Sequence, residues 1–393
     1  MSAALDRERM QQALVLARDS IGLSDPNPRV GCVIGRDDGT VLGTGHTQRA
    51  GEAHAEVMAL RDAKANGADV RGSTAWVTLE PCAHHGRTGP CCEALIDAGI
   101  GRVVVATHDP FRDVNGKGIA RLRAAGIRVD MSEQTLAARA VELNIGFFSR
   151  IIRGRPWVRL KAAASLDGRT ALPNGRSQWI TSEAARRDNQ GWRARAGAIV
   201  TGIGTVLADN PRMDVRDVAV AHPPWRVVLD SQWRTPGASR LMGTPGPVLV
   251  VGVQDDVPAA RRLRDAGAEC LALGNQDGRV DLAKLVGELA RRQINEVHLE
   301  AGATLNGGFI EAGLVDEWLL YLAPKLLGAG SGIAALTGMD SLDGAPEIEL
   351  IHIDPVGPDL RLRGIAPPGR ADWPPAWVSM ILTLGADLSA NQP

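Results

Sequence analysis

The chain has 393 residues, 44% of them hydrophobic and 23% charged, which is long enough for two globular domains of ordinary size. Its formal net charge of −1 offers no general attraction to phosphate backbones, so we expect no nucleic-acid partner. No apolar stretch is long enough to cross a bilayer, and the charged first ten residues lack the apolar core of a signal peptide, so we expect no membrane partner.

The first half of the chain alternates predicted helices and strands. Apolar residues at helical spacing predict helices, and short apolar runs bounded by Gly, Asp or Pro predict strands. In chain order we predict a helix at 6–21, a strand at 30–35 with a hairpin turn at 37–39, a helix at 54–64, a strand at 74–79, a helix at 91–98, and strands at 102–106 and 126–129.

A metal-binding pattern lies where these strands are followed by helices, which is the usual position of a site in an open α/β sheet. His54, Cys82 and Cys91 supply one imidazole and two thiols, a set that can hold zinc in three of its four tetrahedral positions. Glu56 follows His54 by two residues and can move protons without ligating the metal. Zinc nucleobase deaminases divide the work in this way between a metal-activated water and a carboxylate that is not a ligand.

The spacing of the two cysteines differs from the usual P-C-x-x-C signature of these deaminases. Eight residues, 83–90, separate Cys82 from Cys91, and a loop of this length still serves one metal if Cys91 begins the next helix. A helix N-terminus favours the thiolate that zinc needs. A closed structural zinc site, with His84, His85 or Cys92 as the fourth ligand, is one alternative; buried cysteines without any metal are another.

Cysteine usage indicates a reducing compartment. The count of five is odd, three of the five cluster at residues 82–92, and Cys32 and Cys270 stand alone in apolar surroundings. This pattern is typical of a metal site with reduced thiols and not of a disulfide framework. We therefore expect a cytoplasmic protein.

The second half begins a new α/β pattern after a predicted linker at 153–156. Residues beyond 364 are rich in Pro and Trp, and we expect a tail that is weakly ordered or packed on the surface. The predicted elements are strands at 157–161, 198–201, 226–229, 247–251, 269–273, 296–299 and 317–322, and an amphipathic helix at 282–292.

Two glycine-rich turns in this half predict phosphate binding. Residues 201–205 (TGIGT) and 300–308 (EAGATLNGG) each follow a predicted strand, and small residues there let backbone N–H groups approach an anion. The dinucleotide fingerprint G-x-G-x-x-G is absent. Arg193 and Arg216 lie near the first turn in the sequence, and we expect them to meet a substrate phosphate through bidentate contacts.

Taken together, these motifs resemble a known family, the bifunctional deaminase/reductases of riboflavin biosynthesis. The deaminase half is matched by residues 27–31 (NPRVG), 51–57 (GEAHAEV) and 81–92 (PCAHHGRTGPCC), including its long cysteine spacing. The reductase half is matched by residues 160–168 (LKAAASLDG), 177–181 (SQWIT) and 323–328 (APKLLG).

The resemblance implies an α/β protein of two domains and a tail. A cytidine-deaminase-like zinc domain at 1–150 would remove an amino group from a diaminopyrimidinone that carries a ribosylamino 5′-phosphate. A dihydrofolate-reductase-like domain at 151–368 would then use NADPH to reduce the ribosyl group to ribityl, and residues 369–393 would form the tail. The expected partner is this small substrate, and we expect a homo-oligomer.

The resemblance also implies the roles of individual residues. His54, Cys82 and Cys91 would bind zinc, and Glu56 would be the catalytic acid and base. The reductase substrate would contact Ser177, Arg193, Met213, Arg216 and Glu300. The NADPH site would be lined by Ala163, Trp179, Thr205, Asp209, Ser231, Gly302, Ala303, Thr304, Leu305, Asn306, Gly307 and Gly308.

Three other functions remain open from the residues themselves. The first is a nucleic-acid editor, in which the first domain deaminates a base in tRNA and the second binds RNA; the near-neutral charge counts against it. The second is a non-catalytic scaffold that zinc stabilises and that merely binds a nucleotide. The third is an enzyme in which only one half is active, although no site in the sequence is visibly broken.

Overall fold

A computed structural model describes residues 2–83, 89–111, 115–255, 257–338 and 340–367. Its internal contacts divide these residues into two compact units, one up to Arg153 and one from Gly154 onward. The predicted boundary after residue 150 falls in the last turn of α6 (Ile145–Arg153). The predicted tail, residues 369–393, lies outside the described residues. Within the described part of the chain, no helix has the length and apolar character that a membrane span requires.

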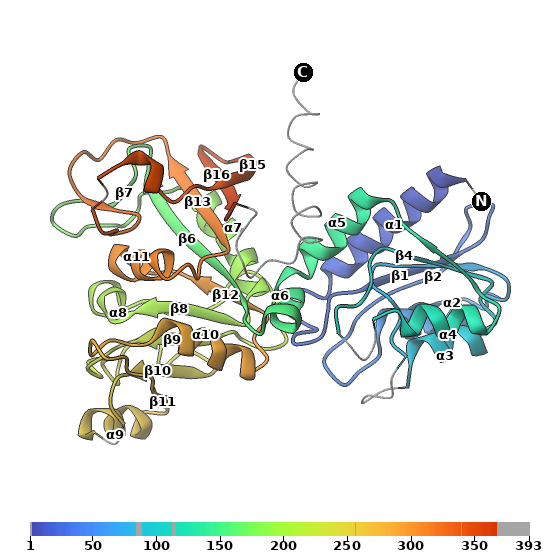
Figure 1. Cartoon of the computed structure of the whole chain (residues 1–393), viewed down its shortest axis with the longest axis horizontal. Coiled ribbons are helices and arrows are strands. Elements are labelled where there is room, and N and C mark those ends of the chain that lie inside the picture. Colours follow the sequence, from blue (N-terminus) through green and yellow to red (C-terminus); the bar gives the residue numbers. More distant parts are fainter. Residues whose placement is uncertain (1, 84–88, 112–114, 256, 339, 368–393) are drawn as a thin grey trace. The chain divides into compact units, whose positions relative to one another are not determined.

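The first unit is built on a five-stranded sheet (Figure 1). Its strand order is β2-β1-β3-β4-β5, with β1 antiparallel to both β2 and β3, and with β3, β4 and β5 parallel. The strands are β1 (Gly31–Gly35), β2 (Val41–His46), β3 (Thr74–Val77), β4 (Arg102–Val105) and β5 (Arg128–Met131).

Helices cover both faces of this sheet. Figure 1 shows α1 and α5 on one face and α2, α3 and α4 on the other, and the α1–α5 side encloses a core around Trp76. The helices are α1 (Ala3–Arg18), α2 (Ala55–Ala65), α3 (Cys91–Asp97), α4 (Lys117–Ala124) and α5 (Gln134–Leu143), followed by α6.

Glycines on β2 place α2 unusually close to the sheet. A Cβ atom on Gly43 would lie 2.3 Å from the backbone oxygen of Ala59, and one on Gly45 would lie 2.5 Å from that of Ala55. Side chains at these two positions would therefore push the helix away. This contact fixes the start of α2, where His54 and Glu56 lie.

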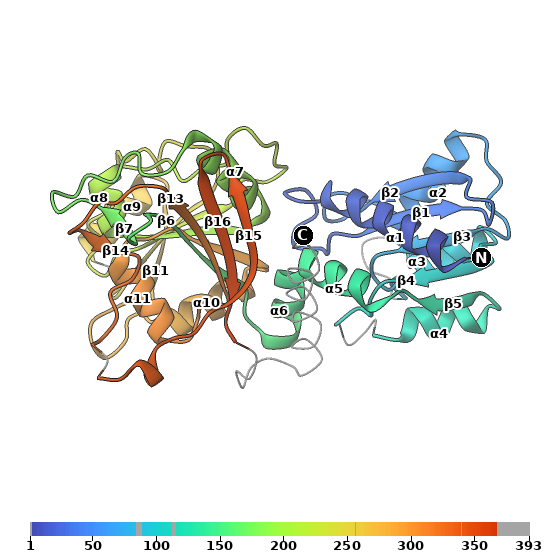
Figure 2. The same cartoon turned by 90° about the horizontal axis from the view of Figure 1, so that it is seen from above.

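The second unit contains a nine-stranded sheet in the order β11-β10-β9-β8-β12-β6-β13-β16-β15. The strands from β11 to β13 are parallel, and β16 and β15 complete the sheet as antiparallel strands (Figure 2). The strands are β6 (Trp157–Ser165), β8 (Ala198–Gly202), β9 (Trp225–Leu229), β10 (Val248–Gly252), β11 (Glu269–Ala272), β12 (Glu296–Leu299), β13 (Glu317–Ala323), β15 (Glu349–Val356) and β16 (Asp359–Ile365).

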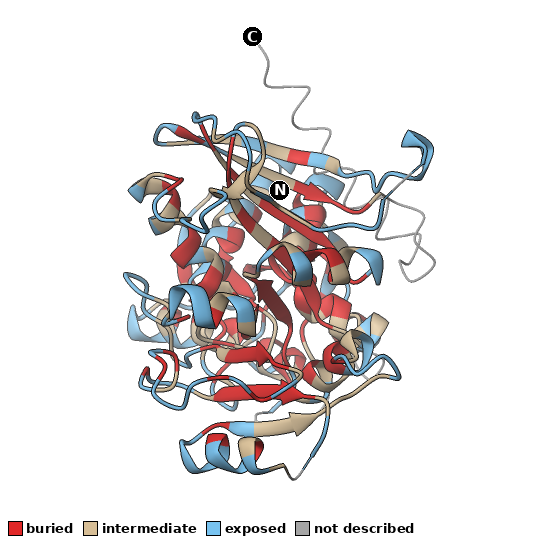
Figure 3. Cartoon of the chain, turned by 90° about the vertical axis from the view of Figure 1, so that its left-hand side faces the viewer, coloured by how far each residue is buried: buried red, intermediate tan, exposed pale blue. Residues whose placement is uncertain are grey.

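Helices pack on this sheet so that its central strands are buried while the outer helix faces stay exposed (Figure 3). They are α7 (Glu183–Arg195), α8 (Ile203–Asp209), α9 (Pro258–Asp265), α10 (Leu282–Arg291) and α11 (Ala303–Glu311), with a 3₁₀ turn, η1, at Leu342–Gly344. A small sheet pairs β7 (Arg169–Ala171) with β14 (Ser331–Gly332). The predicted mixed α/β fold is confirmed in both units.

Candidate active sites

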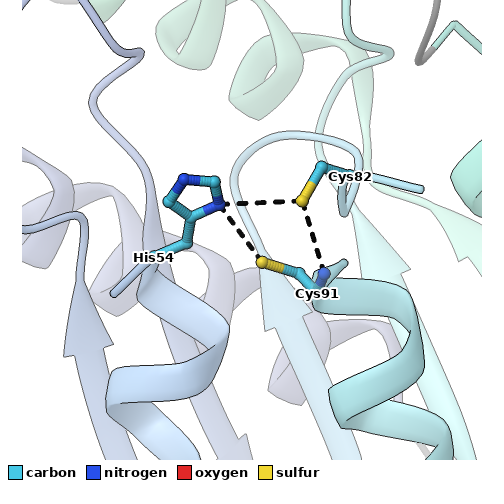
Figure 4. A group of neighbouring side chains, drawn as sticks. All are labelled: His54, Cys82 and Cys91. Carbon is cyan, nitrogen blue, oxygen red and sulfur yellow. Dashed lines mark hydrogen bonds between the residues drawn. The ribbon is translucent and has the colours of Figure 1, made fainter. Parts of the chain in front are cut away.

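The three predicted zinc ligands meet in the first unit. His54 caps the N-terminus of α2, Cys82 follows β3, and Cys91 is the first residue of α3. Figure 4 shows the three side chains pointing toward one another. Nδ1 of His54 lies 3.3 Å from Sγ of Cys91 and 3.7 Å from Sγ of Cys82, and the three ligand atoms all lie within 4.8 Å of one another.

These distances fit a zinc ion. Tetrahedral bonds of about 2.3 Å to sulfur and about 2.0 Å to nitrogen place neighbouring ligand atoms about 3.5 Å apart. The two nitrogen–sulfur distances, 3.3 and 3.7 Å, bracket that value. Among the described residues the cluster supplies three ligands, which would leave one tetrahedral position for water.

Cys92, the one proposed fourth ligand of a closed structural site that the structure describes, does not complete this cluster. Cys92 is buried on α3, and its sulfur is not part of the group. His84 and His85 lie outside the described residues. Among the residues that the structure does describe, the geometry therefore favours an open site.

The environment favours a thiolate at Cys82. A hydrogen bond from the thiol of Cys91, assisted by the ring of His54, lowers the pKa of Cys82 to about 4. The backbone N–H of Cys91 also donates to this sulfur, at 3.3 Å. Since Cys91 donates its thiol proton to Cys82, its own pKa is raised, and metal binding to the pair releases that proton.

Glu56 lies beside the ligands in the first turn of α2, with only 3% of its surface exposed. Burial, together with the negative charge of Cys82, raises its pKa to about 7. A buried carboxyl group that changes protonation near neutral pH suits general acid–base chemistry.

Sequence reasoning missed a second buried carboxyl group near the metal ligands. Asp109 follows β4, is 7% exposed, and has a pKa raised to about 7, mainly by burial. Glu80 holds this loop, since its carboxylate accepts backbone N–H groups from Asp109, Gly116 and Ile119. The sequence could have indicated Asp109 because His108 and Asp109 lie shortly after a buried strand. Binding sites of α/β proteins are usually found at that end of the strands.

The second unit contains a cavity of about 2050 Å³ at the carboxyl ends of its parallel strands. Pockets for one small ligand measure roughly 300–1,000 Å³, so this cavity has room for a dinucleotide and a second molecule. Fifteen of the predicted reductase residues line it: Ala163, Ser177, Trp179, Arg193, Thr205, Asp209, Met213, Arg216, Ser231, Glu300, Gly302, Ala303, Thr304, Leu305 and Gly308.

The two glycine-rich turns lie next to each other because β8 and β12 are neighbouring parallel strands. A Cβ atom on Gly202 would lie 3.4 Å from Leu305, and one on Gly302 would lie 4.0 Å from Oγ1 of Thr205. Gly302 caps α11 without a side-chain hydrogen bond, so backbone N–H groups of the first turn stay available. This arrangement fits the diphosphate of NADPH.

Asn306 and Gly307 are predicted cofactor residues that do not line the cavity. The side chain of Asn306 donates to the backbone oxygens of Ala301 and Ile333 and is buried. A Cβ atom on Gly307 would lie 1.9 Å from the oxygen of Ala335. Because residues 303–311 form a helix, these two positions face the segment at 333–335 instead of the cavity.

Arg193 has a different set of contacts from the bidentate phosphate contact that we expected. Its guanidinium group holds the carboxylate of Glu300 through two hydrogen bonds of 2.7 Å and donates to the backbone oxygen of Asp214. Arg216 and Arg212 both pair with the carboxylate of Asp214 and are about half exposed at the cavity. All three arginines line the cavity, but Arg193 orients Glu300, whereas Arg212 and Arg216 are the more exposed.

Lys161 is a further cavity residue; from the sequence we considered a role in protonation for it but left it out of the predicted site. It lies on β6, lines the cavity, and has a pKa lowered by burial, although the charge of Glu300 opposes that effect. The available signal was a lysine inside a largely apolar strand. The sequence alone could not show that it lies near Glu300, because residue 300 follows a different strand.

An open imidazole–dithiolate site in one unit and a dinucleotide-sized cavity in the other define a class: a zinc deaminase joined to a reductase. The comparisons with known proteins agree. Residues 4–107 match the cytidine and deoxycytidylate deaminase zinc-binding region, and residues 156–362 match the RibD C-terminal domain.

Relatives match nearly the whole chain. The riboflavin biosynthesis protein RibD of Escherichia coli (strain K12) is 45% identical over 91% of this chain and 98% of its own length, and that of Aquifex aeolicus is 36% identical over 92% and 98%. The solved structure of Acinetobacter baumannii RibD, form 1, has 41% identity and a TM-score of 0.82, covering 93% of this chain and 99% of that one. A deaminase/reductase structure from Thermotoga maritima has 29% identity and a TM-score of 0.82 over the same shares.

The chain therefore belongs to the RibD family. It is a bifunctional enzyme of riboflavin biosynthesis, with a zinc-dependent deaminase and an NADPH-dependent reductase in one polypeptide.

Proposed function

We propose that residues 1–150 deaminate a diaminopyrimidinone carrying a ribosylamino 5′-phosphate, and that residues 151–368 reduce the ribosyl group of the product to ribityl. The cluster of His54, Cys82 and Cys91 is the single observation that best supports the first step. The Thermotoga maritima relative carries the name diaminohydroxyphosphoribosylaminopyrimidine deaminase/5-amino-6-(5-phosphoribosylamino)uracil reductase, which supports this choice of substrates.

In the deaminase, zinc supplies Lewis-acid activation of a water molecule when it is bound. His54, Cys82 and Cys91 hold the ion. Glu56 takes a proton from the attacking water and returns it to the departing amine, so that a ring C–N bond is replaced by C–O and ammonia leaves. Its burial in the first turn of α2 holds the carboxyl group beside the ligands during both transfers.

In the reductase, NADPH supplies the hydride when it is bound. The turns that contain Thr205 and Gly302 bind its diphosphate, and the other cofactor-lining residues are Ala163, Trp179, Asp209 and Ser231. The substrate contacts Ser177, Met213, Arg216 and Glu300, with Arg193 acting through Glu300. The half-exposed guanidinium groups beside Asp214 suit the substrate phosphate, and the ionised Glu300 suits a sugar hydroxyl.

Assays of the full chain with zinc test this function against its rivals. With the diaminopyrimidine phosphate we expect ammonia release without any nicotinamide, and NADPH oxidation only once the deaminated product is present. We expect no ammonia from tRNA. Ammonia from tRNA would favour a nucleic-acid editor, and no NADPH oxidation with the deaminated product would favour a scaffold or a half-active enzyme.

We further propose that the protein is a cytoplasmic homo-oligomer that associates through the β15–β16 edge of the second sheet. Leu350, Ile353 and Leu360 are 42–49% exposed there, and an apolar edge strand is a site of association. The reduced state of the cysteines supports the compartment.

The mass in solution tests the oligomer. We expect wild-type protein to have a multiple of the 41.6 kDa chain mass in light scattering, and Ile353→Lys to lower it. Val15→Lys is the matched control, since Val15 is 60% exposed on α1 and should leave the mass unchanged. A wild-type monomer would contradict the proposal.

A further inference from the structure

The two oxygens of the Glu300 carboxylate have unequal numbers of hydrogen-bond donors around them. Oε1 accepts hydrogen bonds from Nε of Arg193 at 2.7 Å and from Nδ2 of Asn189 at 2.9 Å, and it lies 3.1 Å from Nε2 of His298. Oε2 accepts one hydrogen bond, from Nη2 of Arg193 at 2.7 Å, among the described residues. The side chain is 16% exposed and lines the cavity.

The surroundings of His298 determine which of its ring nitrogens carries the proton. Nε2 lies 3.1 Å from Oδ1 of Asn189 and 3.1 Å from Oε1 of Glu300, and both of these oxygens can only accept. Nδ1 is buried and has no partner within the described part of the chain. The proton therefore sits on Nε2, and the ring shares it between Oδ1 of Asn189 and Oε1 of Glu300. Complete burial lowers the pKa of His298, which keeps the ring neutral.

Two elements deliver these donors to one oxygen. His298 lies on β12 at the centre of the sheet, two residues before Glu300. Asn189 and Arg193 are four residues apart on α7, so they lie on the same face of that helix. The donors thus come from rigid elements and are in place before any ligand binds.

We propose that His298 and Asn189 are positioning residues of the reductase: they fill Oε1 of Glu300 so that Oε2 is the oxygen that accepts a hydrogen bond from a hydroxyl of the ribosyl group. This inference rests on the proposed role of Glu300 in substrate binding. A carboxylate oxygen accepts about two strong hydrogen bonds. Three donors saturate Oε1, whereas Oε2 keeps one lone pair for the cavity.

Without the donor at His298, the carboxylate would lose one of the contacts that fix its rotation, so Oε2 would be presented to the sugar hydroxyl less often. The loss should therefore appear in substrate binding and not in cofactor binding, because the predicted cofactor residues of the second turn begin at Gly302, after Glu300. A change in substrate binding without a change in NADPH binding distinguishes this positioning role from a general contribution to stability.

The test compares substitutions in the full-length enzyme. In His298→Leu we expect KM for the ribosyl substrate to rise about tenfold, the order of one lost hydrogen bond, with kcat and the Kd for NADPH within about twofold of wild type. His298→Gln keeps an N–H donor and should recover most of the loss. His222→Leu is the matched control in the same unit and should change none of these values. Asn189→Ala should raise KM in the same way if His298→Leu does not fold.

Glu300→Gln separates the proposed role of Glu300 in substrate binding from the proposed positioning role of His298 and Asn189. If Glu300→Gln leaves KM unchanged, the proposed role of Glu300 is wrong. If Glu300→Gln raises KM but His298→Leu and Asn189→Ala do not, or if they weaken NADPH equally, only the positioning role is wrong.

NMR spectroscopy tests the inference without any substitution at His298. In ¹⁵N-histidine-labelled wild-type protein, His298 should carry its proton on Nε2 without any ligand, and that N–H signal should shift in Glu300→Gln. A proton on Nδ1, or a signal unaffected by Glu300→Gln, would overturn the inference.

Discussion

Glu56→Gln is expected to abolish deamination while the protein keeps its zinc. Glutamine has nearly the shape of glutamate but cannot take up and return a proton, so the water loses its general base and the departing amine loses its proton donor. General acid–base groups contribute roughly 10²–10⁴-fold to rate, and we expect ammonia release to fall by at least that factor. Ammonia release and zinc content, measured on the same preparation, check this result.

The neighbouring Glu52 provides the control. It is exposed and lies four residues before Glu56, outside the ligand cluster, so Glu52→Gln should leave both the rate and the zinc content unchanged. Zinc-loaded Glu56→Gln with a wild-type rate would remove the proposed acid–base role, whereas loss of zinc would assign Glu56 to metal binding instead.

Cys82→Ser is expected to remove zinc and deamination together but to spare the reductase. A serine hydroxyl does not ionise at neutral pH and is a poor zinc ligand, whereas the environment of Cys82 lowers the pKa of its thiol to about 4. Zinc content should fall from about one per chain to near zero. NADPH oxidation with the deaminated substrate should persist, because the reductase cavity lies in the second unit.

Two other cysteines test whether this effect is specific. Cys270→Ser, in the second unit, should keep zinc and both activities. Cys92→Ala removes the sulfur next to the ligand Cys91 and should also keep zinc, because Cys92 lies outside the cluster. Loss of zinc in Cys92→Ala would instead support a closed structural site, and Cys82→Ser protein that retains zinc would refute the assigned ligand set.

The deaminase ligands were within reach of sequence reasoning because their geometry is local. His54 and Glu56 share the start of one helix, and Cys82 and Cys91 flank one loop, so the residue types and their spacing carry most of the information. Asp109 was not found in this way, since a lone aspartate after a strand has no distinctive spacing, and only the adjacency of β3 and β4 brings it near Cys82.

In the reductase, the sequence indicated which glycine-rich turns and charged residues belong to the predicted site. It did not indicate which of these side chains contact one another. Arg193 pairs with the carboxylate of Glu300, which lies 107 residues further along the chain, so the sequence could not indicate this contact. Asn306 and Gly307 belong to the predicted cofactor turn, yet the helical period turns them toward another segment.

The sequence by itself determined the two α/β halves, the metal ligands with their carboxyl neighbour, and the glycine-rich turns, because each depends on residues close together along the chain. The tertiary structure alone decided which oxygen of Glu300 is filled, which arginines face the cavity, and where Lys161 and His298 lie. Those outcomes depend on the order of strands in the sheet and on the face that α7 presents to it, and strand order is set by packing between distant segments.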